Sequence, residues 1–253
     1  MSFTIIILCF VAFFAGFIDA IVGGGGLIQT PAGLILLPNQ SVAQVIGSLK
    51  IPSFTGTFFA ARTFLKKIKI PIKRILLFTI LAFVASYLGS LCLTKVSNQF
   101  MKPVILIVLA IIAIYTFTKK DFGRKTQYQA LQFPWYKGAI ICLGLGFYDG
   151  FIGPGAGSLL VLAFISWLGF DFLQANAHAK VVNLATNLGS ILLFTLKGAI
   201  LWHIAVPMAI CNAIGGILGS RFAIVKGNGF IRTVFLLVII GTLCRLGYDV
   251  FLH

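Results

Sequence analysis

The sequence contains no glutamate, and five aspartates are the only acidic residues among its 253 positions. Charged residues of both signs make up 10% of the chain, whereas a soluble domain carries about 25%. So few charges cannot cover a surface that faces water, and 59% of the residues are hydrophobic. Apolar runs of about 20 residues recur, each long enough to cross a hydrocarbon core of roughly 30 Å. The composition predicts an all-α polytopic membrane protein.

Motifs of enzymes and nucleotide-binding proteins are absent as well. The sequence has no H-E-x-x-H, no nucleophile elbow, no CxxC and no ATP-binding motif. Five cysteines are scattered singly through apolar runs, which is typical of buried, unreactive thiols. We therefore expect no enzymatic activity, no metal site and no cofactor.

A glycine-rich stretch occurs twice in the sequence. Residues 16–26 read GFIDAIVGGGG, and residues 146–157 read GFYDGFIGPGAG. The aspartates of the two stretches, Asp19 and Asp149, are 130 positions apart. The same offset relates further matching residues, namely Gln44 with Gln174, Lys50 with Lys180, Lys67 with Lys197 and Gly89 with Gly219. The constant offset predicts two repeats of one unit.

The predicted repeats are residues 1–118 and 138–253, joined by a cytoplasmic linker over 119–137. Each repeat has about five hydrophobic segments. The second segment of each, 27–37 and 156–168, is too short to cross a bilayer, which predicts broken or re-entrant helices. The full set of expected segments is 3–22, 27–37, 41–65, 72–93, 100–117, 138–152, 156–168, 172–196, 204–222 and 231–251.

Basic residues in the loops indicate how the repeats are oriented. Most of them lie in 62–74, 119–137 and 221–232, which the positive-inside rule places in the cytoplasm. The bias reverses between equivalent loops, so the second repeat is predicted to be inverted, with both termini outside. The net charge of +15 is explained by this distribution, and we expect a lipid bilayer as the partner and no nucleic acid.

The glycine stretches lack the Lys-Ser or Lys-Thr of a phosphate loop and the preceding strand of a dinucleotide fold. In a membrane, a backbone break before a short helix directs free N–H groups and a positive dipole at an anion. The alternative is that the glycines only permit close helix packing. The substrate-binding candidates here are Gly23, Gly24, Gly25, Gly26, Gly153, Gly155, Gly157 and Ser158.

Lys50 and Lys180 lie near the middle of apolar segments. A charge at the bilayer centre costs about 2.5–3.5 kcal/mol on insertion scales, so these lysines are expected to face the interior. Asn183 and Asn187 share the helical face of Lys180. The pattern predicts two polar walls of a wet, positive cavity, and the alternative is that each lysine extends to the interface.

Asp19 and Asp149 have two open interpretations. Each carboxylate either caps the short helix or balances a lysine, or it is a proton or cation site, because acids inside a membrane mark ion pathways. His178 is expected to be a buried histidine with its hydrogen bonds satisfied.

The stretches at 16–28, 146–158 and 179–190 resemble the TauE/SafE family of sulfite and organosulfonate exporters. The resemblance covers nearly the whole chain and implies a multi-pass transporter of the bacterial inner membrane that exports small anions, with proton coupling as an expected mechanism. The family typically has Thr-Asn-Lys at the first central lysine. This chain has Ser48-Leu49-Lys50, which implies a less polar first wall.

The function expected from the sequence is secondary transport of a small anion that contains sulfur. Two alternatives remain at this point. One is a cation-coupled transporter of another small organic solute, built around the two aspartates. The other is a membrane partner subunit that transports nothing. A homo-oligomer is compatible with each of them.

Overall fold

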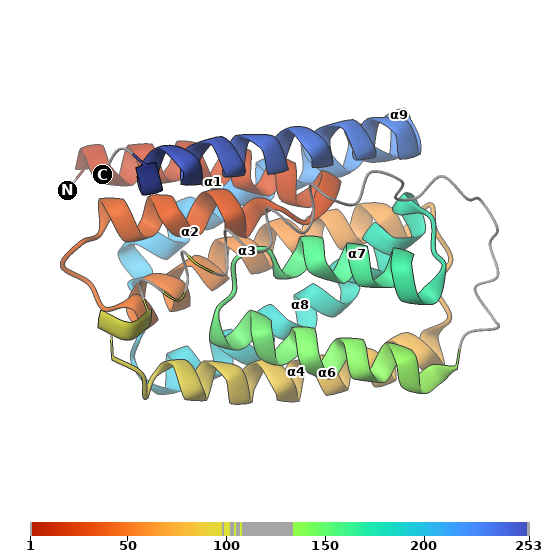
Figure 1. Ribbon diagram of the computed structural model, residues 1–253, viewed down its shortest axis with the longest axis horizontal. Coiled ribbons are helices and arrows are strands. Elements are labelled where there is room, and N and C mark those ends of the chain that lie inside the picture. The colour runs from red at the N-terminus through yellow and green to blue at the C-terminus, as the bar shows by residue number, and fades with distance from the viewer. Residues whose placement is uncertain (1, 98, 102–103, 105–106, 108–133, 252–253) are drawn as a thin grey trace.

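The computed structural model describes residues 2–97, 99–101, 104, 107 and 134–251, and its ordered elements there are helices (Figure 1). The predicted all-α class is confirmed for this part of the chain. The predicted segment 100–117 and linker 119–137 lie mostly outside the described residues. The helices are α1 (Ser2–Val22), α2 (Gly25–Leu36), α3 (Val42–Leu65), α4 (Ile72–Leu93), α6 (Trp135–Phe151), α7 (Ala156–Leu168), α8 (Phe172–Leu196) and α9 (Trp202–Phe251).

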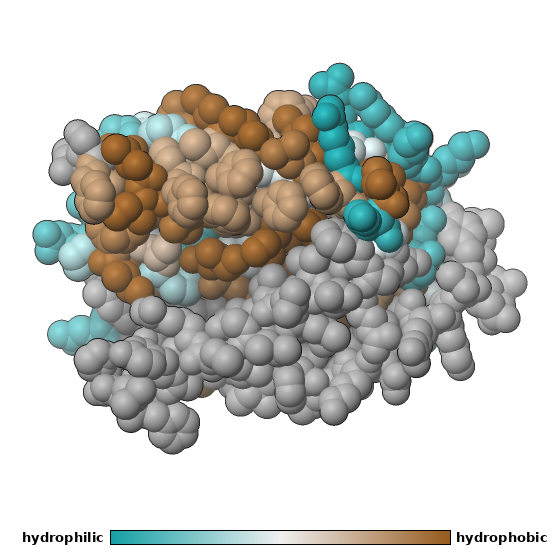
Figure 2. All heavy atoms as spheres, turned by 90° about the horizontal axis from the view of Figure 1, so that it is seen from above, coloured by the Kyte–Doolittle hydropathy of each residue, from teal (hydrophilic) through white to brown (hydrophobic). Residues whose placement is uncertain are grey.

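Several of these helices are long and apolar enough to cross a membrane. They are Phe3–Val22, Ile72–Leu93, Phe172–Leu196 and Trp202–Gly227. Helices α4 and α9 each expose an apolar residue at every fourth position, which places the stripe on one face. Figure 2 shows hydrophobic residues across the middle of the coloured surface and hydrophilic residues toward its two ends. The two stripes are Leu76, Ile80, Val84 and Leu88 on α4, and Val206, Ile210, Ile214 and Leu218 on α9.

Helix boundaries follow local sequence signals. Helix α3 begins with a capping box, in which the Ser41 hydroxyl and the Gln44 side chain each bond the other residue's backbone. The Asp171 carboxylate caps α8 by accepting from the N–H of Gln174 at 2.8 Å. Asp171 follows Ser41 by 130 positions, so both helices begin at matching places.

The breaks that precede α2 and α7 also match. Gly23 has a φ of 77° and Gly153 a φ of 90°, a region that favours glycine. These two positions are again 130 apart. Figure 1 shows α1 and α6 running in opposite directions, while α2 and α7 run away from the centre toward opposite ends.

The helix contacts come in equivalent pairs. Replacing each helix by the one 130 positions earlier or later in the chain gives another contact that is also present. Helix α1 packs on α9 as α6 packs on α4, and α3 packs on α9 as α8 packs on α4. A Cβ on Gly219 would lie 2.2 Å from the Phe17 carbonyl oxygen, and one on Gly89 would lie 2.2 Å from that of Phe147. These paired contacts support the two predicted repeats, whose boundaries and inversion stay predictions.

Helix α9 covers the last two predicted segments, 204–222 and 231–251. It consists of two helices, which meet at Gly227 with a φ of 70° and a ψ of −165°. Figure 1 shows the chain reversing direction within α9, so that its darker C-terminal part runs back toward the N-terminus of the chain.

The two repeats are predicted to present equivalent positions on opposite sides of the membrane. Lys67 and Lys197 are exposed just beyond the ends of α3 and α8. In a protein with its five native cysteines replaced, we expect Lys197→Cys to react with a membrane-impermeant maleimide in intact cells. We expect Lys67→Cys to react only after permeabilisation. Labelling of both from one side would contradict the inversion.

Candidate functional site

The two helix breaks meet inside the protein. A Cβ on Gly23 would lie 2.4 Å from the carbonyl carbon of Gly157, and one on Gly26 would lie 3.3 Å from the Cα of Pro154. Backbone therefore touches backbone here, and the hydroxyl of Ser158 donates to the carbonyl of Val22 at 3.3 Å. The glycines permit this close approach, and the approach places the starts of α2 and α7 beside each other.

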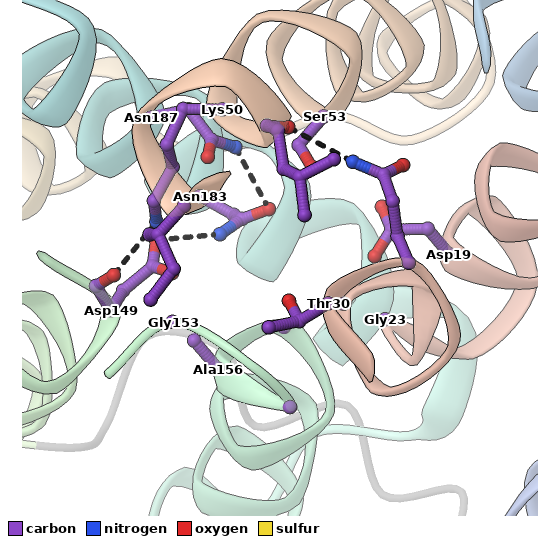
Figure 3. Close-up of a pocket in the computed structure, with 16 residues that line it drawn as sticks. Asp19, Gly23, Thr30, Lys50, Ser53, Asp149, Gly153, Ala156, Asn183 and Asn187 are labelled. Atoms are coloured by element: carbon purple, nitrogen blue, oxygen red, sulfur yellow. Dashed lines mark hydrogen bonds and ion pairs between the residues drawn. The ribbon is translucent and has the colours of Figure 1, made fainter. Parts of the chain in front are cut away.

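A cavity of about 40 Å³ lies beside this contact (Figure 3). At roughly 10–15 Å³ for each water, it has room for about three water molecules. The predicted site residues that line it are Gly23, Gly26, Gly153, Gly155, Gly157, Lys50, Asn183, Asn187, Asp19 and Asp149. Four predicted residues, Gly24, Gly25, Ser158 and Lys180, are not in the lining. Further lining residues are Gln29, Thr30, Ile46, Leu49, Ser53 and Ala156.

Lys50 and Asp149 form a buried ion pair on one wall. The Lys50 Nζ lies 2.7 Å from Asp149 Oδ1 and donates to the Asp149 carbonyl at 2.7 Å. The other carboxylate oxygen, Oδ2, accepts from the amide of Asn183 at 3.1 Å and from the hydroxyl of Thr186. The Lys50 side chain is 6% exposed and that of Asp149 is 4% exposed. Every oxygen of Asp149 thus has a donor.

Lys180 and Asp19 form a second pair across the cavity from Asp149. The Lys180 Nζ lies 2.5 Å from Asp19 Oδ2. Asp19 Oδ1 accepts from the N–H of Gly25, the first residue of α2, at 3.3 Å, and the Thr57 hydroxyl lies 3.4 Å from Oδ2. The Lys180 side chain is 1% exposed and that of Asp19 is 18% exposed. Asp19 therefore faces the cavity, and Lys180 lies behind it.

Each ion pair joins one predicted repeat to the other. Lys50 and Asp19 belong to residues 1–118, and their partners Asp149 and Lys180 belong to 138–253. The sequence predicts a positive cavity, whereas in the structure the four formal charges cancel. A buried ammonium requires a counter-charge because desolvation would otherwise cost several kcal/mol. The structure thus shows lysine balancing by both aspartates, and a proton role for either stays a prediction.

Backbone donors also reach the cavity. The first N–H groups of a helix have no intrahelical acceptor. In the described part of the chain the amides of Gly26 and Gly155, at the starts of α2 and α7, make no hydrogen bond. Both residues line the cavity, so an anion there would meet uncommitted N–H groups.

Side-chain amides connect the walls. Asn187 donates to the side-chain oxygen Oδ1 of Asn183 at 3.4 Å, and the Asn183 amide donates to Asp149 Oδ2. On the α2 side, Gln29 donates to the Leu49 carbonyl at 3.0 Å and accepts from Asn212 at 2.9 Å. The role of Gln29 and Asn212 is missed by the sequence reasoning, although polar residues within apolar runs are a signal that could have found them.

Two further polar residues on α8 have structural roles. The amide of Asn176 donates to the carbonyls of Ala20 and Ile21 at 3.0 and 2.7 Å and so holds the end of α1. A ring nitrogen of His178 lies 2.8 Å from the Gln174 carbonyl oxygen, and the ring is 5% exposed. His178 is buried and hydrogen-bonded, as the sequence predicts.

A model of the family described as sulfite exporter TauE/SafE matches residues 8–246. The chain belongs to the TauE/SafE family. A Haemophilus influenzae protein named "Probable membrane transporter protein" is 37% identical over 246 residues, covering 96% of this chain and 94% of the relative. A Sinorhizobium protein, "Probable membrane transporter protein ORF9", is 32% identical, covering 98% and 95%. YfcA of Escherichia coli K12, also named a probable membrane transporter protein, is 33% identical, covering 96% and 89%.

No solved structure matches this TauE/SafE chain. The family and the names of its relatives identify a membrane transporter and not an enzyme. Each of the three stretches that resemble the family contributes to the cavity wall, through residues such as Asp19, Asp149 and Asn183. At the first central lysine, where the resemblance implies Thr-Asn, this chain has Ser48 and Leu49. The Ser48 hydroxyl donates to the Gln44 carbonyl and accepts from the N–H of Leu201, so it serves packing between helices.

We expect Lys50→Ala to destabilise the TauE/SafE protein more than Lys50→Ala combined with Asp149→Asn. Removing one partner of a buried pair costs about 3–5 kcal/mol because it leaves an unpaired charge. The double variant removes that charge, so part of the loss should be recovered. Thermal unfolding in detergent measures the order of the apparent melting temperatures. The exposed Lys67→Ala should match the wild type, and equal melting of single and double variants would contradict the pairing.

Gly157→Ala tests the contact between the two breaks. The Cβ of this alanine would lie 2.6 Å from the Gly23 carbonyl oxygen. Overpacking of this kind lowers the free energy of unfolding by about 1–3 kcal/mol. Gly144→Ala on α6 is the matched control, because a Cβ there has no neighbour within 4 Å. We expect a lower apparent melting temperature only for Gly157→Ala, and a wild-type value for that variant would exclude the close approach.

Proposed function

We propose that this TauE/SafE transporter is a secondary, proton-coupled exporter of a small sulfur-containing anion such as sulfite or a sulfonate, located as a multi-pass protein in the bacterial inner membrane. One observation carries the proposal. Two Lys–Asp pairs, one buried and one partly exposed, flank one small cavity at which the starts of α2 and α7 meet. The description of the family as sulfite exporters supports the sulfur chemistry.

Competition between the substrate and a carboxylate supplies the coupling. In the present structure each lysine is neutralised by an aspartate, so a second anion has no unbalanced positive charge to bind. Protonation of an aspartate frees its lysine, and the anion can then pair with that lysine. Anion and proton therefore bind together and cross in the same direction, so an outward gradient of the anion drives the export and carries the proton with it.

The same ion pairs explain how the anion could pass from one side to the other. Each pair joins the two predicted repeats, and Lys50 also holds the backbone of the opposing repeat at the Asp149 carbonyl. When an anion replaces a carboxylate, one tie between the repeats is lost. The repeats can then shift against each other around a fixed central site, as in other transporters built from inverted repeats.

The alternatives fit the site less well. A cation-binding site requires several oxygen ligands, but each aspartate already pairs with a lysine, and the nearby helix starts present N–H donors. A partner subunit that transports nothing is disfavoured because the relatives align over nearly their full length and are named as membrane transporters.

Anion binding to the purified protein tests the proposal. We compare the wild type with a double variant, Lys180→Ala with Asp19→Asn, which removes a lysine without leaving a buried unpaired carboxylate. The titrants are sulfite, thiosulfate and methanesulfonate. Charge-assisted hydrogen bonds contribute roughly 1.5–3 kcal/mol, so affinity should fall by about 10- to 100-fold.

Lys197→Ala is the matched control, because Lys197 is an exposed cation at the end of the same helix. It should bind like the wild type. Equal affinity of the double variant and the wild type would remove Lys180 from the site, and an absence of binding by the wild type would overturn the anion substrate.

A further inference from the structure

Resting on the proposed function, we propose that Asp19 is the group that the transported anion replaces. Asp19 takes up a proton, leaves Lys180 and the start of α2, and the anion occupies the place of its carboxylate. Asp149 stays ionised beside Lys50 and serves as a fixed link in the fold. The two acids, although equivalent in the predicted repeats, then have different tasks.

The two carboxylates are held very differently. Asp149 accepts from Lys50 at 2.7 Å, from Asn183 at 3.1 Å and from Thr186, and its side chain is 4% exposed. Asp19 has one short contact, to Lys180, and two long ones of 3.3 and 3.4 Å, and its side chain is 18% exposed. Asp149 is thus held by more short contacts and lies deeper, while Asp19 faces the cavity with a partly exposed carboxylate.

The sequence accounts for this difference between the surroundings of the two aspartates. The donors to Asp149 are Asn183 and Thr186, and the residues 130 positions earlier are Ser53 and Gly56. No hydrogen bond joins Ser53 to Asp19 in the described part of the chain. Gly56 has no side chain, and a Cβ there would lie 1.9 Å from the Asn212 Oδ1, so the space for a threonine is filled. The first repeat therefore lacks both donors that fix the acid in the second.

The contacts of Asp19 form a ready-made anion site. They comprise the Lys180 ammonium, the N–H of Gly25 and the Thr57 hydroxyl, and they come from three different helices. A carboxylate at the start of α2 is also stabilised by the helix dipole. A small oxyanion with two or more acceptor oxygens, such as a sulfonate, sulfite or thiosulfate, can take over these donors.

The other titratable groups do not offer the same exchange. Lys50 and Asp149 occupy the opposite wall, and α2 and α7 carry no ionisable side chain. His178 on α8 bonds Gln174 and packs against Phe170. On α1 and the helices that pack against it, none of the other ionisable side chains that the structure describes bonds Asp19. They are Cys9 on α1, Arg62 on α3, and His203, Cys211, Arg221 and Lys226 on α9. Lys180 is thus the charged group that Asp19 contacts, and the proton comes from water in the cavity.

Calorimetric titration with thiosulfate in two buffers of different ionisation enthalpy counts the protons taken up on binding. Thiosulfate is chosen because it stays fully ionised at mildly acidic and mildly alkaline pH. The wild type should take up about one proton for each anion and bind more tightly as pH falls. Asp19→Asn should bind with about zero proton uptake and lose the pH dependence, because the amide cannot hold Lys180 by charge.

Asp149→Asn is the matched control, since it makes the same change at the equivalent position. It should keep the uptake of about one proton while its apparent melting temperature falls. Continued proton uptake by Asp19→Asn, or loss of uptake in Asp149→Asn alone, would overturn the assignment. Absence of thiosulfate binding in the wild type would instead contradict the proposed function itself.

Ser53→Asn provides a second test if Asp19→Asn does not fold. An amide at this position supplies the donor that Asp149 receives from Asn183, and it favours the ionised form of Asp19. Half-maximal thiosulfate binding should then shift to a lower pH, with affinity recovered under acidic conditions. An unchanged pH profile would contradict the role of Asp19.

Discussion

The structure depends on one constraint, which is that an ammonium group buried in an apolar bundle must have a counter-charge. Lys50 and Lys180 are almost wholly buried, with side chains 6% and 1% exposed. Their partners come from the ends of α6 and α1, so the sites of charge neutralisation are also the sites where the two predicted repeats meet. The interior is formally neutral for this reason, and in the proposed mechanism the anion displaces a carboxylate rather than entering an empty positive pocket.

The glycine breaks lie beside the ion pairs. Asp19 and Asp149 are in the last turns of α1 and α6, and in each case the chain ends one helix and begins another inside the protein. Irregular backbone at membrane depth is tolerated where protein buries it, and here each break covers the other through the contact of Gly23 with Gly157. Packing by glycine and presentation of helix N–H groups, which the sequence leaves as alternatives, are two results of one geometry.

Much of this arrangement could be predicted because it is encoded locally. The breaks at Gly23 and Gly153 and the starts of α3 and α8 depend on residues within a few positions of each other. The pairing of lysines with aspartates could not be predicted, because it joins residues far apart in the chain. The bond between Asn212 and Gln29 spans 183 positions and was missed for the same reason. The sequence therefore identifies the charged groups but predicts a positive cavity, since it does not show that each lysine already has its anion.

The two predicted repeats differ in the residues that surround their equivalent aspartates, and this difference affects how easily each ion pair opens. Two identical ion pairs would open with equal difficulty, and breaking a buried pair costs about 3–5 kcal/mol, so opening both would roughly double that barrier. With Asn183 and Thr186 on one acid, and Ser53 and Gly56 at the matching positions of the other, the energies separate. In the proposed mechanism, one pair stays closed and keeps the repeats aligned while the other exchanges its carboxylate for the substrate. Two predicted repeats that keep the same acids would then differ in function because the neighbours of those acids differ.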